Sequence, residues 1–414
     1  MAEAKCPFSG VEDLLEQNYL QDPYPALLQL REEAPVAQLP GTQTFLVSRH
    51  EDLSTVFRDR DTYSSAKSTD PFFPVCPEAR AILSSGFPRK PTFTNCDPPR
   101  HPKMRQALAQ CLTPVRWERS RPAVREYATT LVERLAIKPQ ADLVADLMYP
   151  LPAFAGFELL GFPTADTDRL KEWCVTRVLL TYGKLDAAGQ VQAANELTSF
   201  WNYVRDHVQR RMREPADDLT SDLLALSATI GDDLTTEDVI NMIYSTALAS
   251  HETSQNAILN GLKRLLGERE QWDALCADQT LIPNAVEELL RLESPVMTLR
   301  RTVTKDTTLG GVAMPAGSQV LLQPAAGNHD PAHFPDGDRL DIRRKNAREH
   351  LTFGKQWHFC LGSPLARFEY NLVLELLTTR TPHMRLLAGQ TFTYLPTMQF
   401  RVLEKLLVAP APAA

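Results

Sequence analysis

The chain has 414 residues, of which 43% are hydrophobic and 23% charged, a composition typical of a globular protein that can bury a large core. Its formal net charge of -7 argues against a general nucleic-acid binder, because such a protein needs a basic face. The seven cysteines are scattered and include no CxxC pair. This excludes a disulfide framework or a zinc ribbon and favours a reducing compartment.

The N-terminal segment lacks the apolar stretch of a signal peptide, and nowhere do about 18 consecutive apolar residues occur. We therefore expect a cytoplasmic protein that is not anchored in a membrane. Because there is no internal repeat and no long Gly/Ser linker, we expect residues 1–414 to form a single domain.

In chain order, residues 35–56 predict two short strands around a Pro-Gly turn and then a helix from about His50. Leucines recur at helical spacing between residues 131 and 151. Residues 235–266 begin with a Thr/Glu/Asp-rich cap and predict one long, mostly buried helix. Short strands are expected again in residues 308–324 and beyond Met384. The sequence thus predicts a mainly α fold with a smaller β-rich part from about residues 30–60, 296–345 and 384–408.

A polar cluster, residues 250–254, interrupts the long apolar helix. Helical periodicity places on one face, with Thr253 at its edge, the residues Asn241, Ser245, Leu248, Ala249 and Glu252. Burying a polar group without a partner costs about 1 to 3 kcal/mol, so this cluster is either hydrated or functional. Three interpretations stay open: a zinc site, although the HExxH pattern has Gln255 in place of its second histidine; a proton relay from a carboxylate to a hydroxyl; and a hydrated kink without chemistry.

Residues 353–362, FGKQWHFCLG, form a loop directly before a helix that we expect to begin near Gly362-Ser363-Pro364. The free N–H groups and dipole of a helix start stabilise a thiolate, so Cys360 is suited to be a nucleophile or a metal ligand. A cysteine hydrolase needs a histidine base beside the sulfur, and nothing in the sequence directs His358 towards it. The pattern therefore favours a metal ligand.

This loop resembles the haem-binding loop of the cytochrome P-450 superfamily, and four further motifs follow the order of that family. They are DPPRHPKMR (97–105), LASHETS (248–254), ELLR (288–291) and NHDPAHFPDGDRLDIRR (328–344). Segments such as LIPNAVEELLR look closest to the haem domains of self-sufficient bacterial members that are fused to phthalate-dioxygenase-type reductases. The resemblance implies the cytochrome P-450 fold, with haem between the long central helix and the helix after the Cys loop.

The implied activity is that of a monooxygenase, which inserts one atom of O2 into a small to medium apolar organic substrate by hydroxylation or oxidative dealkylation. The implied cofactor is a noncovalent haem b, iron protoporphyrin IX, with Cys360 as its axial thiolate. Other implied haem contacts are Ala249, Phe353, Gly354 and Gly362. The haem propionates would be paired with His101, Arg105, Arg301 and His358.

The resemblance also implies roles for other side chains. Glu252 and Thr253 would deliver protons, with Glu252 as the link to solvent and Thr253 as the hydrogen-bond donor. A charged structural network would consist of Glu288, Arg291 and Arg339. The apolar substrate pocket would include Phe72, Phe73, Ser245, Leu248, Met297 and Met398.

Two positions depart from the family pattern. Ser250 replaces the glycine usual in the oxygen-binding helix, and Gln356 replaces the second glycine of the FGxG turn. We expect Gln356 to adopt a positive φ, at a cost of about 1 to 3 kcal/mol.

The 414 residues contain neither a GxGxxG dinucleotide motif nor a CxxC-type iron–sulfur cluster motif, so we expect electrons to come from another protein. A ferredoxin with its reductase is the donor that the resemblance implies. It would dock on positive charge supplied by Lys103, Arg116, Arg119 and Lys355. A peroxide-driven peroxygenase, a non-oxygenating haem-thiolate enzyme and a haem-binding sensor remain alternatives.

Overall fold

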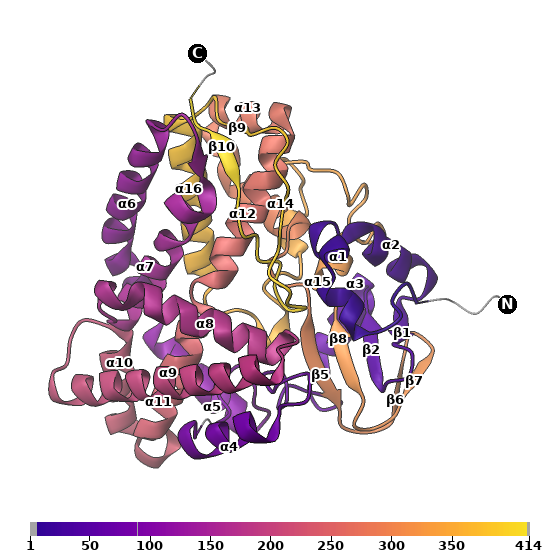
Figure 1. Ribbon diagram of the computed structural model, residues 1–414, viewed down its shortest axis with the longest axis vertical. Helices are drawn as coiled ribbons and strands as arrows, with labels where there is room; N and C mark the ends of the chain where they lie inside the picture. Colours follow the sequence, from indigo (N-terminus) through magenta and orange to yellow (C-terminus); the bar gives the residue numbers. More distant parts are fainter. Residues whose placement is uncertain (1–5, 89, 412–414) are drawn as a thin grey trace. The chain divides into compact units, whose positions relative to one another are not determined.

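The computed structural model describes residues 6–88 and 90–411, which separate into two compact units. Residues 6–64, 125–151 and 253–411 form the first unit, and residues 65–88, 90–124 and 152–252 form the second. Figure 1 shows the helices and strands with the labels used below. Within the described part of the chain, no helix is long and apolar enough to cross a membrane.

The first unit contains a five-stranded sheet that joins distant parts of the sequence (Figure 1). Its order is β1 (Val36–Gln38), β2 (Thr44–Val47), β8 (Gln319–Leu322), β5 (Leu299–Val303) and β3 (Tyr63–Ser64). Only β2 and β8 pair in parallel, with Phe45 opposite Val320; the other neighbours are antiparallel. The first two predicted β-rich segments therefore share one sheet.

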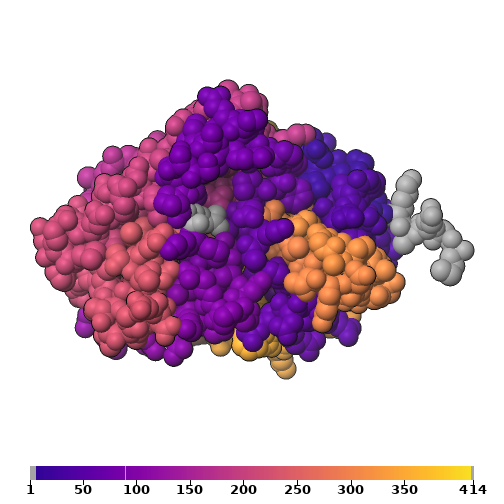
Figure 2. Space-filling view, turned by 90° about the horizontal axis from the view of Figure 1, so that it is seen from below, coloured from indigo at the N-terminus to yellow at the C-terminus, as the bar shows by residue number. Residues whose placement is uncertain are grey.

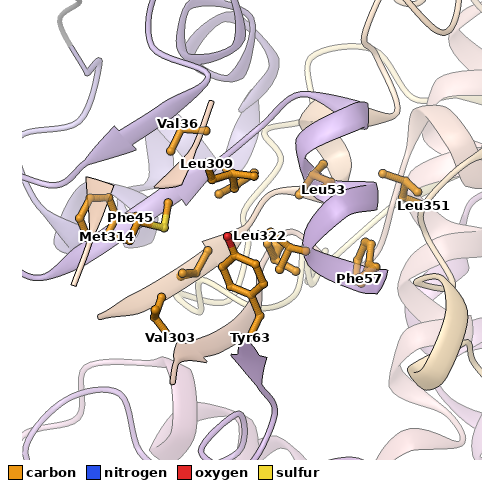
Figure 3. Close-up of a cluster of buried hydrophobic side chains, with 13 residues drawn as sticks. Val36, Phe45, Leu53, Phe57, Tyr63, Val303, Leu309, Met314, Leu322 and Leu351 are labelled. Atoms are coloured by element: carbon orange, nitrogen blue, oxygen red, sulfur yellow. The ribbon is translucent and has the colours of Figure 1, made fainter. Parts of the chain in front are cut away.

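One face of this sheet packs against α3 (His50–Arg58), which begins where the sequence predicts. Figure 3 shows the resulting core, in which Leu53 and Phe57 of the helix lie with Phe45 and Leu322 of the sheet. Leu351 belongs to the same cluster. Burying such a side chain contributes about 1.5 to 3 kcal/mol, so the core anchors the chain two residues before the Cys loop begins.

Two smaller β structures complete the first unit. β10 (Leu407–Ala409) lies between β4 (Ala141–Asp142) and β9 (Arg385–Leu386). From the sequence, residues 141–142 are expected in the helical part. This prediction is wrong, because these residues pair with β10, which comes from the far end of the chain. β6 (Thr307–Leu309) and β7 (Val312–Met314) form a hairpin within the orange surface region of Figure 2.

The helices of the first unit precede and follow these strands. They are η1 (Val11–Leu15), α1 (Gln17–Gln21), α2 (Tyr24–Glu33), α12 (Glu252–Gly267), α13 (Arg269–Ala277), α14 (Ile282–Leu292), α15 (Pro324–Gly327) and α16 (Ser363–Arg380). The first residue of α12, Glu252, falls in the second unit, and α6 (Pro114–Ala136) has residues in both. Shorter turns are η5 (Gln279–Leu281), η6 (Ala347–Glu349) and η7 (Gln356–His358), and η2 (Val144–Met148) is a π-helix.

The second unit is built from helices. They are α4 (Pro77–Gly86), α5 (Arg100–Cys111), α7 (Pro150–Leu160, from residue 152 onwards), α8 (Thr167–Tyr182), α9 (Ala187–Arg213), α10 (Leu219–Ile230) and α11 (Thr236–Ala249), with the short turns η3 (Thr164–Asp166) and η4 (Gly231–Asp233). The long helix α9 packs against α4, α8, α10 and α11. Its Phe200 and Trp201 lie 4.7 and 5.8 Å from the ring of Tyr244 on α11, so aromatic packing joins these two helices.

The long helix predicted over residues 235–266 is interrupted. α11 begins with a capping box of Thr235 and Asp238 and ends at Ala249, and α12 begins at Glu252. Ser250 Oγ donates to the carbonyl of Ala247 at 3.2 Å, and His251 Nδ1 lies 3.1 Å from the same oxygen. Side chains thus bond a carbonyl at the end of α11, which is a recognised cause of a helix break.

A glycine on the neighbouring helix α7 leaves room for Ser250. A Cβ added at Gly156 would lie 2.7 Å from the Cβ of Ser250, closer than real Cβ atoms approach. Ser250, where the resemblance implies a glycine, is therefore matched by the absence of a side chain at residue 156.

We predict that Gly156→Ala lowers the free energy of unfolding by about 1 to 3 kcal/mol, because the added methyl overpacks this contact. The second substitution Ser250→Gly should restore most of the loss, as measured by denaturant unfolding. Gly267→Ala is the control, because a Cβ there meets no atom within 4 Å. Equal stability losses in the single and double variants would contradict the proposed contact.

Candidate haem-thiolate site

The Cys loop turns sharply before it reaches the cysteine. Gly354 and Gln356 have φ angles of 68° and 56°, so the positive φ predicted for Gln356 is confirmed. The amide N of Cys360 donates to the carbonyl of Phe353 at 2.9 Å and closes the loop. Together these features bring Cys360 back beside Phe353, the first residue of the loop.

Helix α16 begins directly after the loop, as the sequence predicts. Gly362 is its N-cap and Pro364 lies in its first turn. A Cβ added at Gly362 would lie 3.7 Å from Cys360 Sγ, so the sulfur lies beside the helix start. The free N–H groups and the helix dipole there favour a thiolate.

The outer side of the loop carries two exposed aromatic rings. Trp357 is 44% exposed and Phe359 is 39% exposed. The guanidinium carbon of Arg60 lies 3.6 Å from the centre of the Trp357 ring, within the range of a cation–π contact. These aromatic side chains flank His358 at the surface of the first unit.

The four residues predicted to hold propionates lie on three kinds of element. His101 is buried on α5, and Arg105 follows one turn later, so the predicted shared helical face is confirmed. Arg301 is buried on β5, where Nη1 donates to the carbonyl of Arg300 at 2.8 Å. His358 ends η7 inside the Cys loop. Arg105 and His358 are half-buried, and cationic or imidazole groups of this kind are suited to carboxylates.

Glu252 is buried at the first position of α12, and burial raises its pKa to about 7. The opposing effect comes from the positive charge of Lys171 on α8, which is also buried and has its pKa lowered to about 8 by burial. Thr253 follows Glu252 and is half-buried between buried neighbours. The arrangement provides a carboxyl group that exchanges protons near neutral pH, next to a hydroxyl group.

Sequence reasoning missed Lys171. A signal was present, because Lys171 shares a buried helical stripe with Cys174 and Val178, three and seven positions later. A lysine on such a stripe needs a charged partner, and Glu252 supplies it.

His251, the histidine of the HETSQ segment, is buried against an aromatic ring. Its ring lies 4.9 Å from that of Phe157, and burial holds the pKa of His251 well below its usual value. Within residues 6–88 and 90–411, no three His, Cys, Asp or Glu side chains are grouped so as to hold a metal ion. The zinc interpretation therefore lacks a ligand set there.

The predicted charged network is present, but its third side chain differs. Arg291 bonds both carboxylate oxygens of Glu288, at 2.7 and 2.8 Å, and both side chains are fully buried. The second cation is Arg344, whose Nε donates to Glu288 at 3.0 Å. The side chain of Arg339 is exposed, and the residue takes part only through its carbonyl, which accepts from Arg291 and Arg344. The assignment of Arg339 is corrected because its turn directs the carbonyl inwards.

The residues expected at the substrate pocket have different environments in the two units. Phe72 and Phe73 of the second unit are half-buried, with ring centres 5.4 Å apart. On α11, Leu248 is half-buried and Ser245 Oγ lies 3.1 Å from Thr92 Oγ1. Met297 and Met398 are buried in the first unit.

The expected basic docking charges are largely neutralised. Arg116 is buried and donates to Asp217 and Asp222 at 2.8 and 2.6 Å, so it cannot serve as an exposed contact. The other three are engaged as well: Lys103 with Asp233, Arg119 with Asp217 at 2.7 Å, and Lys355 with Ser54 at 3.4 Å. Three of these charges have acidic partners from distant segments, which the sequence alone does not reveal, whereas the partner of Lys355 is an uncharged hydroxyl.

Comparisons with known proteins identify the family. The family model "Cytochrome P450" matches residues 234–380. The cytochrome P450 monooxygenase PikC of Streptomyces venezuelae is 35% identical over 90% of this chain and 87% of its own. The chain belongs to the cytochrome P450 family.

Solved structures agree with this. The CYP116B5 haem domain of Acinetobacter radioresistens has a TM-score of 0.92, with 33% identity over 96% of both chains. An intact type IV self-sufficient cytochrome P450 monooxygenase has a TM-score of 0.91 and 35% identity, over 97% of this chain and 53% of its own. The expected P450 fold is thus confirmed, as is the likeness to haem domains of self-sufficient members.

As a cytochrome P450, the protein is a haem-dependent monooxygenase that acts on organic substrates with O2 and with electrons from a redox partner. Haem b is its cofactor. The residues present fit it: Cys360 forms no disulfide and lies at a helix start, and buried basic side chains such as Arg301 suit the propionates.

The corrected charged network gives a direct test. We predict that Arg344→Ala lowers the free energy of unfolding by about 1 to 3 kcal/mol, because Glu288 loses a hydrogen-bonding cation in a buried position. Arg339→Ala should change it by about 0.5 kcal/mol or less, as is usual for an exposed side chain. Denaturant unfolding of the two variants measures the difference. A larger loss for Arg339→Ala would contradict the correction.

Proposed function

We propose that Glu252 and Thr253 are the proton relay of this cytochrome P450. The observation that carries the proposal is the buried carboxyl of Glu252, with a pKa of about 7, directly before Thr253. A group that transfers protons works best when its pKa lies near the working pH. The carboxyl oxygens of Glu252 would exchange a proton with solvent, and the hydroxyl of Thr253 would donate it.

The haem supplies the O2 chemistry when it is bound, and the protein supplies ligands and contacts. We assign the axial position to Cys360 and the contacts around it to Ala249, Phe353, Gly354 and Gly362. The propionates would be held by His101, Arg105, Arg301 and His358. Because relatives match nearly the whole chain, we also propose that residues 1–414 act as one catalytic domain.

The substrate that we propose is a small to medium apolar organic molecule. Half-buried Phe72, Phe73 and Leu248 offer apolar surface in the second unit, where Ser245 is bonded to Thr92. Met297 and Met398 would add flexible apolar surface. Hydroxylation or oxidative dealkylation fits such a molecule, because neither reaction needs a charged group on the substrate.

We predict that Thr253→Ala keeps haem and substrate binding but lowers the yield of product per electron pair by about tenfold or more, because the proton donor is lost. Electrons should appear instead in hydrogen peroxide or water, measured against the consumption of reduced nicotinamide. Thr246→Ala is the control, because the Thr246 hydroxyl donates to the carbonyl of Met242 at 2.8 Å within α11. Unchanged coupling in Thr253→Ala would exclude Thr253 as donor, and efficient turnover with peroxide alone would favour a peroxygenase.

We propose that a ferredoxin with its reductase delivers the electrons and contacts the exposed aromatic side chains of the Cys loop. Trp357 and Phe359 lie three residues and one residue before the ligand Cys360, and their exposure makes them available to a partner. Three of the four expected basic residues, Lys103, Arg116 and Arg119, are paired with aspartates and offer little charge for steering. We therefore expect contact through aromatic surface, with a weak dependence on ionic strength.

We predict that the 414-residue chain is inactive with reduced nicotinamide alone and active with added ferredoxin and reductase. Trp357→Ala should raise the KM for ferredoxin by about tenfold or more, because exposed tryptophans often dominate the energy of an interface. Ile137→Ala is the control, since Ile137 is 86% exposed outside the Cys loop. An unchanged KM for Trp357→Ala, or a steep loss of turnover with salt, would contradict aromatic docking.

A further inference from the structure

A second buried glutamate on α14, Glu287, is bonded by side chains from around the Cys loop. Arg367 of α16 donates to Glu287 through Nε at 2.7 Å and Nη2 at 3.0 Å. His350 Nε2 lies 3.2 Å from the same carboxylate, and its Nδ1 accepts from the amide of Thr352. Since Nδ1 is the acceptor, Nε2 carries the proton and donates to Glu287. These bonds hold the pKa of Glu287 at about 2 against the effect of burial, so the carboxylate is charged throughout the neutral range.

The same guanidinium contacts the first residue of the Cys loop. The central carbon of Arg367 lies 4.6 Å from the centre of the Phe353 ring, which is also 5.5 Å from the ring of His350. The carbonyl of Phe353 in turn accepts the hydrogen bond from the amide of Cys360. Contacts therefore run from Glu287 through Arg367 and Phe353 to the backbone of the cysteine.

Arg367 is placed to hold both ends of the loop. It lies in the second turn of α16, the helix that follows Cys360, and its side chain contacts Phe353, the residue that opens the loop. The two-point bond to Glu287 fixes the plane of the guanidinium, and the central carbon of this group lies over the Phe353 ring. A lysine would supply charge at one point and would fix no plane.

We propose that Arg367, held by Glu287, is a positioning residue for the Cys360 ligand. It keeps the backbone bond between Phe353 and Cys360 in register with the start of α16, so that the sulfur remains a thiolate bound to the haem iron. This inference rests on the haem-thiolate function, and it assigns to Arg367 and Glu287 a role distinct from that of the neighbouring Glu288 network.

The test compares variants of the haem-loaded protein by two measurements. The first is the fraction of the reduced carbon monoxide complex that shows the absorption band of thiolate ligation. The second is the half-life of haem transfer to an excess of a haem-scavenging protein. We expect Arg367→Met and Glu287→Gln to shorten this half-life by about 10-fold, as loss of an outer contact of a metal ligand commonly does, and to lose part of the thiolate band. Arg367→Lys should lie between Arg367→Met and the unaltered protein.

Arg348→Ala is the matched control. Arg348 approaches the same carboxylate at 3.6 Å, but its side chain is 74% exposed, against 29% for Arg367. It should therefore leave the thiolate band and the haem half-life unchanged. Loss of the band in Arg348→Ala to the same extent as in Arg367→Met would overturn the proposal. The loss would then follow from removal of any positive charge near Glu287, and not from the specific position of Arg367.

A destabilised core variant separates positioning from stability. Leu406→Ala removes a fully buried side chain outside the loop and should cost about 2 to 5 kcal/mol. It should keep the thiolate band at temperatures where it is folded, whereas Arg367→Met should lose part of the band. Equal spectra for the two variants would overturn the proposal. If Arg367→Met does not fold, Arg367→Lys and Phe353→Leu decide the question by the same measurements.

The unaltered protein and Cys360→Ala keep this inference distinct from the function on which it rests. If the unaltered protein lacked the thiolate band, or if Cys360→Ala kept it, the haem-thiolate assignment itself would fail. If both behave as expected and the Arg367 variants match the unaltered protein, only the positioning role is overturned.

Discussion

The fold must hold a negatively charged sulfur at one fixed position, and the Cys loop meets this constraint with backbone geometry. The hydrogen bond from the amide of Cys360 to Phe353 closes the loop, and α16 begins three residues after the cysteine. The free N–H groups and the dipole of a helix start favour a negatively charged sulfur. Leu351 ties the segment before the loop to the core shared by α3 and the five-stranded sheet. The sheet, α3 and α16 thus contribute to the same loop.

Two neighbouring carboxylates on α14 show how this region tolerates buried charge. Burying an isolated carboxylate is very costly, and two on adjacent residues also repel each other. Each has its own arginines: Glu288 is bonded by Arg291 and Arg344, and Glu287 is bonded by Arg367. Removing one partner of such a pair is far more damaging than the net value of the pair, because a buried charge then remains without compensation. Both clusters therefore specify how α14 is joined to the segments around the Cys loop.

Local features were predictable from the sequence because they depend on a few adjacent residues. The start of α16 follows from Gly362 and Pro364, and the positive φ at Gln356 follows from its place in a turn normally built with glycine. The Glu288–Arg291 pair is likewise local, with a spacing of three residues on one helix.

Features that depend on distant partners were not predictable. Arg344 and Arg339 are both arginines in one turn, and only the three-dimensional path of that turn shows which side chain reaches Glu288. The sequence also could not show that Asp217 and Asp222 neutralise Arg116, about a hundred residues earlier. The helix break at residues 250–251 depends partly on Gly156 of another helix, whose missing side chain leaves space for Ser250.

The break between α11 and α12 also sets the position of Glu252 in its helix. In a continuous helix this residue would lie mid-helix, where burial alone would keep its carboxyl group neutral. Because α12 begins at Glu252, the carboxylate lies at a helix N-terminus, which favours the charged form, and Lys171 adds a positive charge from α8. Burial outweighs the effect of Lys171 and raises the pKa to about 7. The interruption of the helix by Ser250 and His251 therefore places at a helix N-terminus the carboxyl group that we propose to exchange protons next to Thr253.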